Sequence, residues 1–119
     1  MKKIVYFIGV YFLFISFICG CNNNSKIEKL LSSTEMNDLI LGALKARKSG
    51  DKRFCHLLIQ NADDPRTSTN LRHKGVSVYQ AKMEALRIIL GEEPPRKIDR
   101  TPDSVVINFF SELMKRSNL

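Results

Sequence analysis

The 119-residue chain has room for one small domain once a targeting segment is set aside, so its length excludes a multidomain enzyme or a membrane channel. Hydrophobic residues make up 44% of the chain and charged residues 26%, which are the proportions of a folded protein rather than a disordered one. Lys and Arg number 19 against 12 Asp and Glu, giving a formal net charge of +7. This excess favours acidic partners, and the three cysteines are too few for a disulfide framework.

The N-terminal segment has the layout of a targeting signal. Met1 to Lys3 is a short positive start, and an uncharged apolar run follows from Ile4 to Cys19. This order is typical of a secretory signal peptide, which is removed from the mature protein. The alternative is an uncleaved transmembrane helix, although the run is shorter than the about 20 residues that such a helix needs. Both interpretations place the remaining domain at a membrane, facing away from the cytoplasm.

The apolar run ends in Ile18, Cys19, Gly20 and Cys21. An aliphatic residue three positions before a cysteine, with a small residue directly before it, resembles the lipobox of bacterial lipoproteins. The resemblance implies that residues 1–20 are a lipoprotein signal peptide and that Cys21 carries a diacylglycerol group that anchors the chain to the membrane. It also implies a place in the bacterial cell envelope. In a host with two membranes, Asn22 after the cysteine resembles the pattern for export to the periplasmic face of the outer membrane.

The segment after Cys21 is polar, with Asn-Asn-Asn-Ser at positions 22–25. Such a tract is typical of a flexible tether. We therefore assign residues 21–31 to the lipid anchor and its tether, and residues 32–119 to a folded helical domain. Ile27, Leu30 and Leu31 leave room for a short turn or helix within the tether. Cleavage before Cys21 removes only two lysines, so the mature chain stays basic.

Two amphipathic helices are predicted in the first half of the domain. The first begins at the capping box Ser32–Glu35 and ends at Gly50. The second begins at Asp51, a suitable cap, and runs to about Asn61, so that the two form a helical hairpin. The apolar positions expected to be buried are Met36, Leu39, Ile40, Ala43, Leu44, Phe54, Leu57 and Leu58.

Two further helices are predicted in the second half. One starts at the capping box Ser77–Gln80 and stops at Gly91, and the other starts at Thr101 with Pro102 in its first turn. Because no segment alternates polar and apolar residues as a strand does, we predict an all-α fold, a small bundle of about four helices. The expected buried positions are Val78, Ala81, Ala85, Leu86, Ile89, Leu90, Val105, Val106, Phe109, Phe110, Leu113 and Met114.

The paired helices and the turn Asp64-Pro65-Arg66 between them resemble a HEAT-type helical repeat over about Met36 to Leu119. The resemblance implies stacked helix pairs as a variant of the bundle. Only about two pairs are available here, however, whereas stacked repeats usually need at least three.

The segment from Ala62 to Gly75 is polar and lacks helical periodicity, at a length that is often functional in compact domains. Its cations, hydroxyls and amides suit the recognition of carboxylate or phosphate groups. The alternative is a solvated connector, and an aromatic residue just beyond the loop is more often part of the core. The candidate partner-binding residues are Arg66, Asn70, Arg72, His73, Lys74 and Tyr79.

The sequence carries no motif of a catalytic or metal centre. Cys55 and His56 are adjacent, which on a helix directs them about 100° apart, and Cys55 is expected to be a buried small hydrophobe. The paired acids Asp63–Asp64 and Glu92–Glu93 flank turns, where such residues usually serve as caps. No zinc-type ligand spacing occurs. We therefore predict a protein that is not an enzyme, with no catalytic residue, no cofactor and no metal site.

These features favour a lipid-anchored, exported helical module that binds a protein partner, for which acidic proteins are candidates. It would act as an inhibitor, an immunity-type protector or an assembly factor. Export argues against nucleic acid as a partner. One alternative is a small envelope hydrolase that uses the acidic turn residues and His73. Another is a structural envelope lipoprotein with a basic surface that faces lipid.

Overall fold

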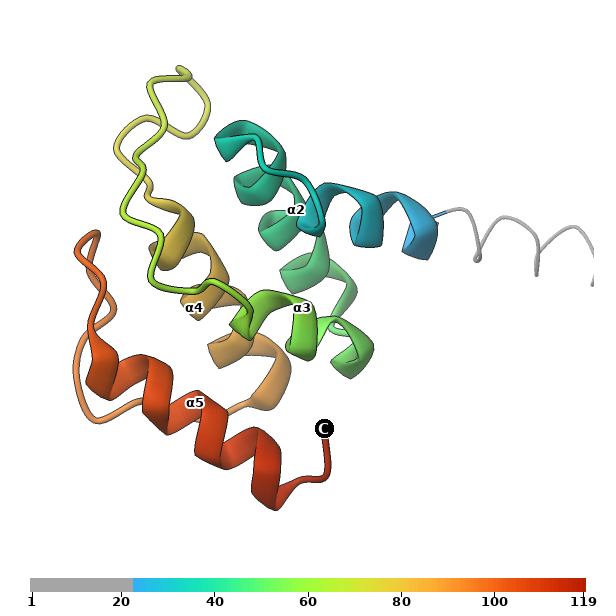
Figure 1. The fold of residues 1–119 in the computed structure, drawn as a ribbon, viewed down its shortest axis with the longest axis vertical. Helices are drawn as coiled ribbons and strands as arrows, with labels where there is room; N and C mark the ends of the chain where they lie inside the picture. The colour runs from blue at the N-terminus through green and yellow to red at the C-terminus, as the bar shows by residue number, and fades with distance from the viewer. Residues whose placement is uncertain (1–22) are drawn as a thin grey trace, which may run out of the picture.

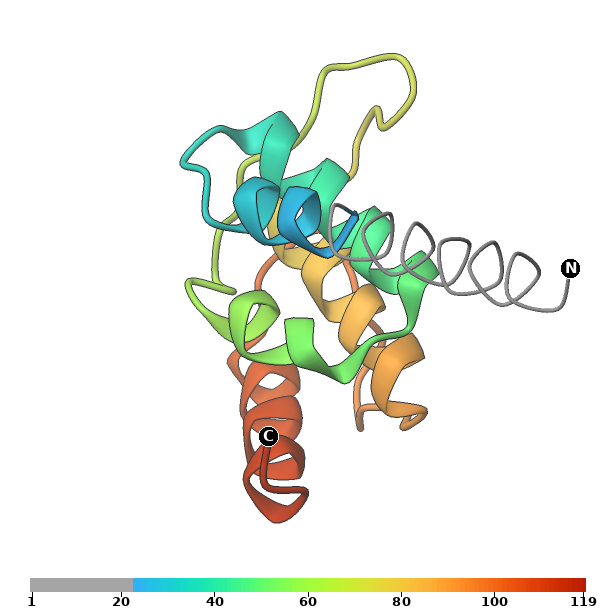
Figure 2. The ribbon, with the colours of Figure 1, turned by 90° about the vertical axis from the view of Figure 1, so that its right-hand side faces the viewer.

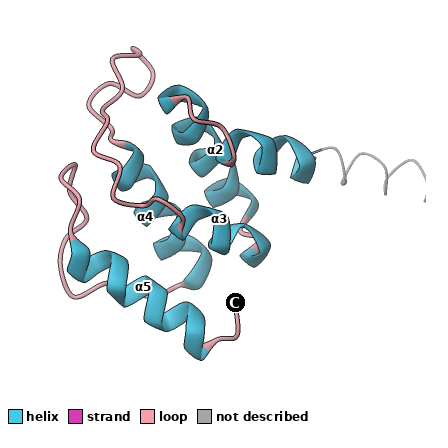
Figure 3. Cartoon of the chain, viewed as in Figure 1, coloured by secondary structure: helices cyan, strands magenta, loops and turns pink. Residues whose placement is uncertain are grey.

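The structure is a computed structural model that describes residues 23–119 (Figure 1). Within that range it is helical, with no β-strand, which confirms the predicted all-α fold (Figure 3). The predicted signal peptide and Cys21 lie outside the described residues. The elements in chain order are a helix at residues 23–31, α2 (Met36–Ser49), the 3-10 helix η1 (Lys52–Phe54), α3 (Cys55–Ile59), α4 (Val78–Leu90) and α5 (Ser104–Arg116).

The short helix left open around Ile27, Leu30 and Leu31 forms, and it extends back to residue 23, so the polar start of the segment is helical where a flexible tether was predicted. Ile27 and Leu31 are 6% and 5% exposed and belong to the hydrophobic core. This helix approaches α2 closely, because a Cβ added at Gly42 would lie 3.0 Å from Leu30 Cβ and 3.1 Å from the Leu31 side chain. A glycine on α2 therefore lets the two helices pack, and burial of the two side chains favours helix over tether.

The predicted capping box at Ser32–Glu35 does not form. The Ser32 amide donates to the carbonyl of Glu28 (3.0 Å), so Ser32 closes the preceding helix instead of opening α2. Glu35 occupies the cap position without a side-chain cap bond. The turn is held by Ser33, whose hydroxyl accepts from the Glu35 amide (3.1 Å) and donates to Asp38 (2.9 Å). The end of α2 is as predicted, at Gly50 with a left-handed φ of 67°.

The second predicted helix is shorter and less regular than expected. Asp51 caps it as predicted, accepting from the Arg53 amide at 2.9 Å, but the first turn is the 3-10 helix η1. The α-helical part ends at Ile59 rather than near Asn61, whose φ is 49°. It packs against α4 and α5 more than against α2, so the predicted hairpin with the first helix does not form. Cys55 is fully buried, as predicted.

The central element is α4, which packs against α2, α3 and α5 (Figure 2). It begins as predicted, with the Ser77 hydroxyl accepting from the Gln80 amide at 3.0 Å, and it ends at Gly91 with a φ of 68°. The reciprocal half of the capping box is missing, since the buried Gln80 Oε1 has no hydrogen-bond partner among the described residues. Eight of its residues are buried, which is expected of a helix enclosed by neighbours on several sides.

The last helix, α5, begins two residues later than predicted. Its cap is Asp103, whose carboxylate accepts from the Val105 amide at 2.9 Å, whereas Thr101 precedes the helix. An aspartate is a strong cap and complements the positive end of the helix dipole. The buried face is narrower than predicted, because Val105 is 37% exposed while Phe109 and Leu113 are half-buried. Its buried positions are Val106, Phe110 and Met114.

Candidate functional site

The segment between α3 and α4 forms a closed loop that projects from the helices (Figures 1 and 2). The Ser68 amide donates to the carbonyl of Val76 (2.9 Å), and the Gly75 amide donates to that of Ser68 (3.0 Å). Ser68 is 2% exposed, and its hydroxyl donates to Asn37 on α2 at 3.3 Å. The base of the loop is thus fixed to the domain, and its tip extends outward.

Four predicted binding residues lie together at the tip of this loop. The Asn70 side-chain oxygen accepts from the Arg72 amide (3.1 Å), and the Asn70 carbonyl accepts from the His73 amide (3.1 Å). Asn70, Arg72 and Lys74 are exposed and His73 is half-buried. No ion pair involves Arg72 or Lys74 among the described residues. The tip therefore presents two cations without ion pairs in the described chain, on a backbone that local hydrogen bonds fold into turns.

Arg66, the fifth predicted residue, lies at the base of the loop and is bound within the domain. Its guanidinium donates to both carboxylate oxygens of Asp64, at 2.7 to 3.1 Å, and to the carbonyl of Thr34 at 3.0 Å. The carbonyls of Asp64 and Arg66 accept from the Tyr79 and Val78 amides at the start of α4, each at 3.0 Å. The Arg66 side chain thus joins the loop to the turn before α2, while the backbone of residues 64 and 66 joins it to the first turn of α4.

Tyr79, the sixth predicted residue, is wrong as a contact residue because it is 0% exposed. Its ring is one of the largest fully buried side chains of the core. Burial raises the pKa of its phenol, and the nearby backbone of Asp103 partly offsets that rise. Its hydroxyl makes no hydrogen bond of standard geometry within residues 23–119. Tyr79 is a core residue in the first turn of α4, and its side chain cannot meet a partner.

Two residues of the loop region were missed by the sequence analysis. Leu71 is 91% exposed, the highest value among the exposed large hydrophobic side chains. Arg100 comes from the link between α4 and α5, and its Nη1 would lie 3.8 Å from a Cβ added at Gly75. An apolar residue inside a polar loop was a signal available for Leu71. No sequence signal points to Arg100, because only the fold brings it beside the loop.

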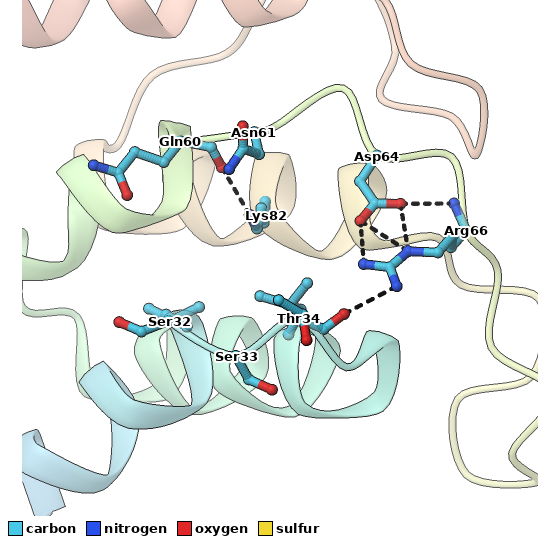
Figure 4. A pocket seen from close by; sticks show the side chains of 10 residues that line it. Ser32, Ser33, Thr34, Gln60, Asn61, Asp64, Arg66 and Lys82 are labelled. Carbon is cyan, nitrogen blue, oxygen red and sulfur yellow. Dashed lines mark hydrogen bonds and ion pairs between the residues drawn. The ribbon is translucent and has the colours of Figure 1, made fainter.

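A pocket of about 540 Å³ lies below the loop, between the turn before α2, the end of α3 and α4 (Figure 4). Lys82 lies at this pocket and is 2% exposed, and its Nζ donates to the carbonyl of Gln60 at 2.8 Å. That carbonyl is at the end of α3, where a cation complements the negative end of the helix. The lining residues are Leu31, Ser32, Ser33, Thr34, Leu39, Gln60, Asn61, Asp64, Arg66 and Lys82.

The two charged groups beside Lys82 leave little free charge in this pocket. Hydrogen bonds from Arg66 hold the pKa of Asp64 below its ordinary value, so the carboxylate stays ionised and paired. Burial lowers the pKa of Lys82, which the charge of Asp64 partly offsets. The native state therefore binds the lysine proton less tightly than the unfolded state, and this contribution to stability rises with pH toward the ordinary lysine pKa. The charged groups of the pocket are thus bound to other groups of the domain, Asp64 to Arg66 and Lys82 to the carbonyl of Gln60.

Two of the four acidic residues considered for catalysis are engaged in ion pairs. Asp64 pairs with Arg66 at 2.7 Å, and Glu93 pairs with Arg87 at 3.0 Å. Within residues 23–119, no ion pair joins His73 to a carboxylate, and no three His, Cys, Asp or Glu side chains are grouped so as to hold a metal ion. Burial raises the pKa of the Cys55 thiol to about 11, so this group is a poor nucleophile.

Comparisons with protein families, with curated proteins and with solved structures found no match to this chain. Among the described helices, none combines the length and the apolar character needed to cross a bilayer.

Proposed function

We propose that the chain is a lipid-anchored, exported binding module that holds a protein partner at the bacterial cell envelope. The observation that carries the binding role is the projecting loop tip, where Leu71 is 91% exposed beside Arg72 and Lys74. An exposed apolar side chain with cations around it is suited to a contact in which the apolar group is buried and the charges remain at the rim.

The chemistry of the tip favours an acidic partner. Arg72 and Lys74 have no internal ion pairs among the described residues, and Arg100 adds a third cation beside Gly75. Opposite charge on a partner would speed association and fix its orientation. The loop is closed by its own hydrogen bonds, so binding would order little additional backbone. A partner that acts as a target for inhibition or protection fits this arrangement as well as an assembly subunit does.

The partner contact is tested by replacing Leu71 with the photoreactive residue p-benzoylphenylalanine in the host. We expect a discrete cross-linked protein, because the side chain at this position is almost fully exposed. Adding Arg72→Gln and Lys74→Gln should reduce the adduct about tenfold or more, as the loss of two rim charges predicts.

The matched control places the same photoreactive residue at Leu119, which is 44% exposed and is the last of the described residues. An adduct of equal yield at both positions, or one that persists without the two charges, would contradict a specific contact at the loop.

The anchor is tested separately with Cys21→Ser. We expect this change to abolish acyl labelling and to release the protein from the membrane fraction, because two acyl chains are enough for stable anchoring. Cys55→Ser is the matched control and should keep the label, since Cys55 is buried in the core. Retention of the unlabelled Cys21→Ser protein in the membrane would contradict lipidation and favour the apolar run at residues 4–19 as the anchor.

A further inference from the structure

A group of four lysines marks the side of the domain on which the described chain begins. Lys26 and Lys29 lie on the helix at residues 23–31, and Lys45 and Lys48 lie on the second half of α2. We call these four residues, together with Leu30 and Leu41, the basic face. Spacings of three and four residues place the members from each helix on one side of that helix.

Two shallow grooves show that the two helices contribute to one continuous surface. Lys26 and Lys45 line both grooves. Lys48 lines the first of them, and Lys29 lines the second together with Leu30 and Leu41. The helix at residues 23–31 meets α2 near its own C-terminal end, where Leu30 and Leu31 approach Gly42 (Figures 1 and 2). The four lysines therefore border one surface although their positions in the sequence are up to 22 apart.

The charge of this face is not neutralised within the domain. None of the four lysines forms an ion pair or a side-chain hydrogen bond among the described residues. The acidic groups nearby are Glu28, which is exposed on the same short helix, and Asp38, which lines the second groove and accepts from Ser33. The cations outnumber these acids two to one, and four lysines close together repel one another. An anionic surface would relieve that repulsion.

We propose that the basic face docks on the anionic phospholipid headgroups of the membrane. Closeness in sequence to the proposed anchor supports a membrane rather than a protein as the binding surface, because Lys26 follows the proposed lipid site Cys21 by only five positions. Leu41 is 38% exposed and Leu30 is half-buried between the lysines, which places apolar surface where it can meet the headgroup region. The inference rests on the proposed membrane location but not on the chemistry of the anchor.

The consequence is a defined orientation of the domain on the membrane. The basic face turns toward the bilayer, while Lys97, on the link between α4 and α5, and the loop around Lys74 come from other parts of the domain (Figure 1). Charge attraction of this kind acts within about one Debye length of the surface, so lysines on other faces stay outside its reach.

The test uses the full chain as isolated from its host, reconstituted in vesicles of phosphatidylglycerol or of phosphatidylcholine. Each lysine is acetylated with acetic anhydride, a neutral reagent, and its rate is followed by mass spectrometry. We expect Lys26, Lys29, Lys45 and Lys48 to react about fivefold more slowly on the anionic vesicles, which is the scale of attraction expected per lysine. Lys74 and Lys97 should react equally on both, and 1 M salt should remove the protection.

Two double variants of equal net charge distinguish an effect of the basic face from an effect of the total charge. Lys45→Gln with Lys48→Gln should reduce the protection of Lys26 and Lys29, whereas Lys74→Gln with Lys97→Gln removes the same charge and should leave it unchanged. Equal rates on both vesicles, or equal protection of all the lysines, would overturn the proposal. If the isolated chain carried no acyl label on Cys21 and the four lysines were still protected, the proposed lipid anchor would be contradicted and the proposed docking of the basic face would be supported.

Discussion

Phe110→Ala is expected to lower the free energy of unfolding by about 3–5 kcal/mol. Phe110 is 0% exposed on α5 and is one of the largest fully buried side chains. Removing its ring loses the transfer free energy of the aromatic group and leaves a cavity that neighbouring helices fill only in part. A domain of this size is marginally stable, so we expect a large fraction of the protein to be unfolded. Urea denaturation followed by circular dichroism measures the change.

Phe109→Ala is the matched control for this prediction. The two rings are adjacent and meet edge to face, with centroids 5.1 Å apart, but Phe109 is only half-buried. Truncating it should therefore cost clearly less than truncating Phe110. If Phe109→Ala were the more destabilising of the two, the face of α5 that packs against the core would have been assigned wrongly.

Gly42→Val should release the helix at residues 23–31 from the domain. Even a single added carbon would lie 3.0 Å from Leu30 and 3.1 Å from Leu31, and valine adds two more. Exposing Ile27 and Leu31 removes the burial of two aliphatic side chains, each of which contributes about 1.5–3 kcal/mol. We expect a loss of about 3–5 kcal/mol in the free energy of unfolding, together with loss of amide hydrogen-exchange protection over residues 23–31 while α4 stays protected.

Arg47→Val tests whether a valine on α2 is itself the cause. Arg47 is exposed on the same helix, so this substitution should change the free energy of unfolding by no more than about 0.5 kcal/mol. If Gly42→Val left the exchange protection of residues 23–31 intact, the close contact between the two helices would not be what holds this segment.

Helix ends were predictable where one local signal decided them. Gly50 and Gly91 end their helices because glycine adopts the left-handed conformation that the stop requires, and Ser77 and Asp51 cap the following turns. Prediction failed where two local signals competed. Ser32 could either cap α2 or close the preceding helix. Its amide donates to the carbonyl of Glu28, so it closes the preceding helix.

The role of residues 23–31 could not be predicted from local sequence because it depends on a distant glycine. Polar residues at the start of the segment suggested a tether, yet Ile27 and Leu31 bury themselves against the domain. Gly42 permits that contact, and it shows in the sequence only as one more small residue within a helix. Long-range packing here outweighed local composition.

The candidate site was predictable in part for the same reason. Loss of helical periodicity located the loop, and four of its predicted residues do lie together at the tip. Arg66 and Tyr79 do not lie at the tip. Arg66 forms an ion pair with Asp64, and Tyr79 is buried in the core. The buried Lys82 had no signature, since its partner is a backbone carbonyl 22 positions away.

The buried thiol of Cys55 can report transient opening of the domain. At 0% exposure, and as the one cysteine among the described residues, it can meet an alkylating reagent only when the packing around it opens. The rate of its modification therefore reports how often the domain exposes this residue, as the opening rate when the reagent reacts faster than the domain recloses and as the open fraction when it reacts more slowly. An oxidising compartment would likewise find this sulfur out of reach, so covalent pairing of two folded domains through it is prevented by packing alone.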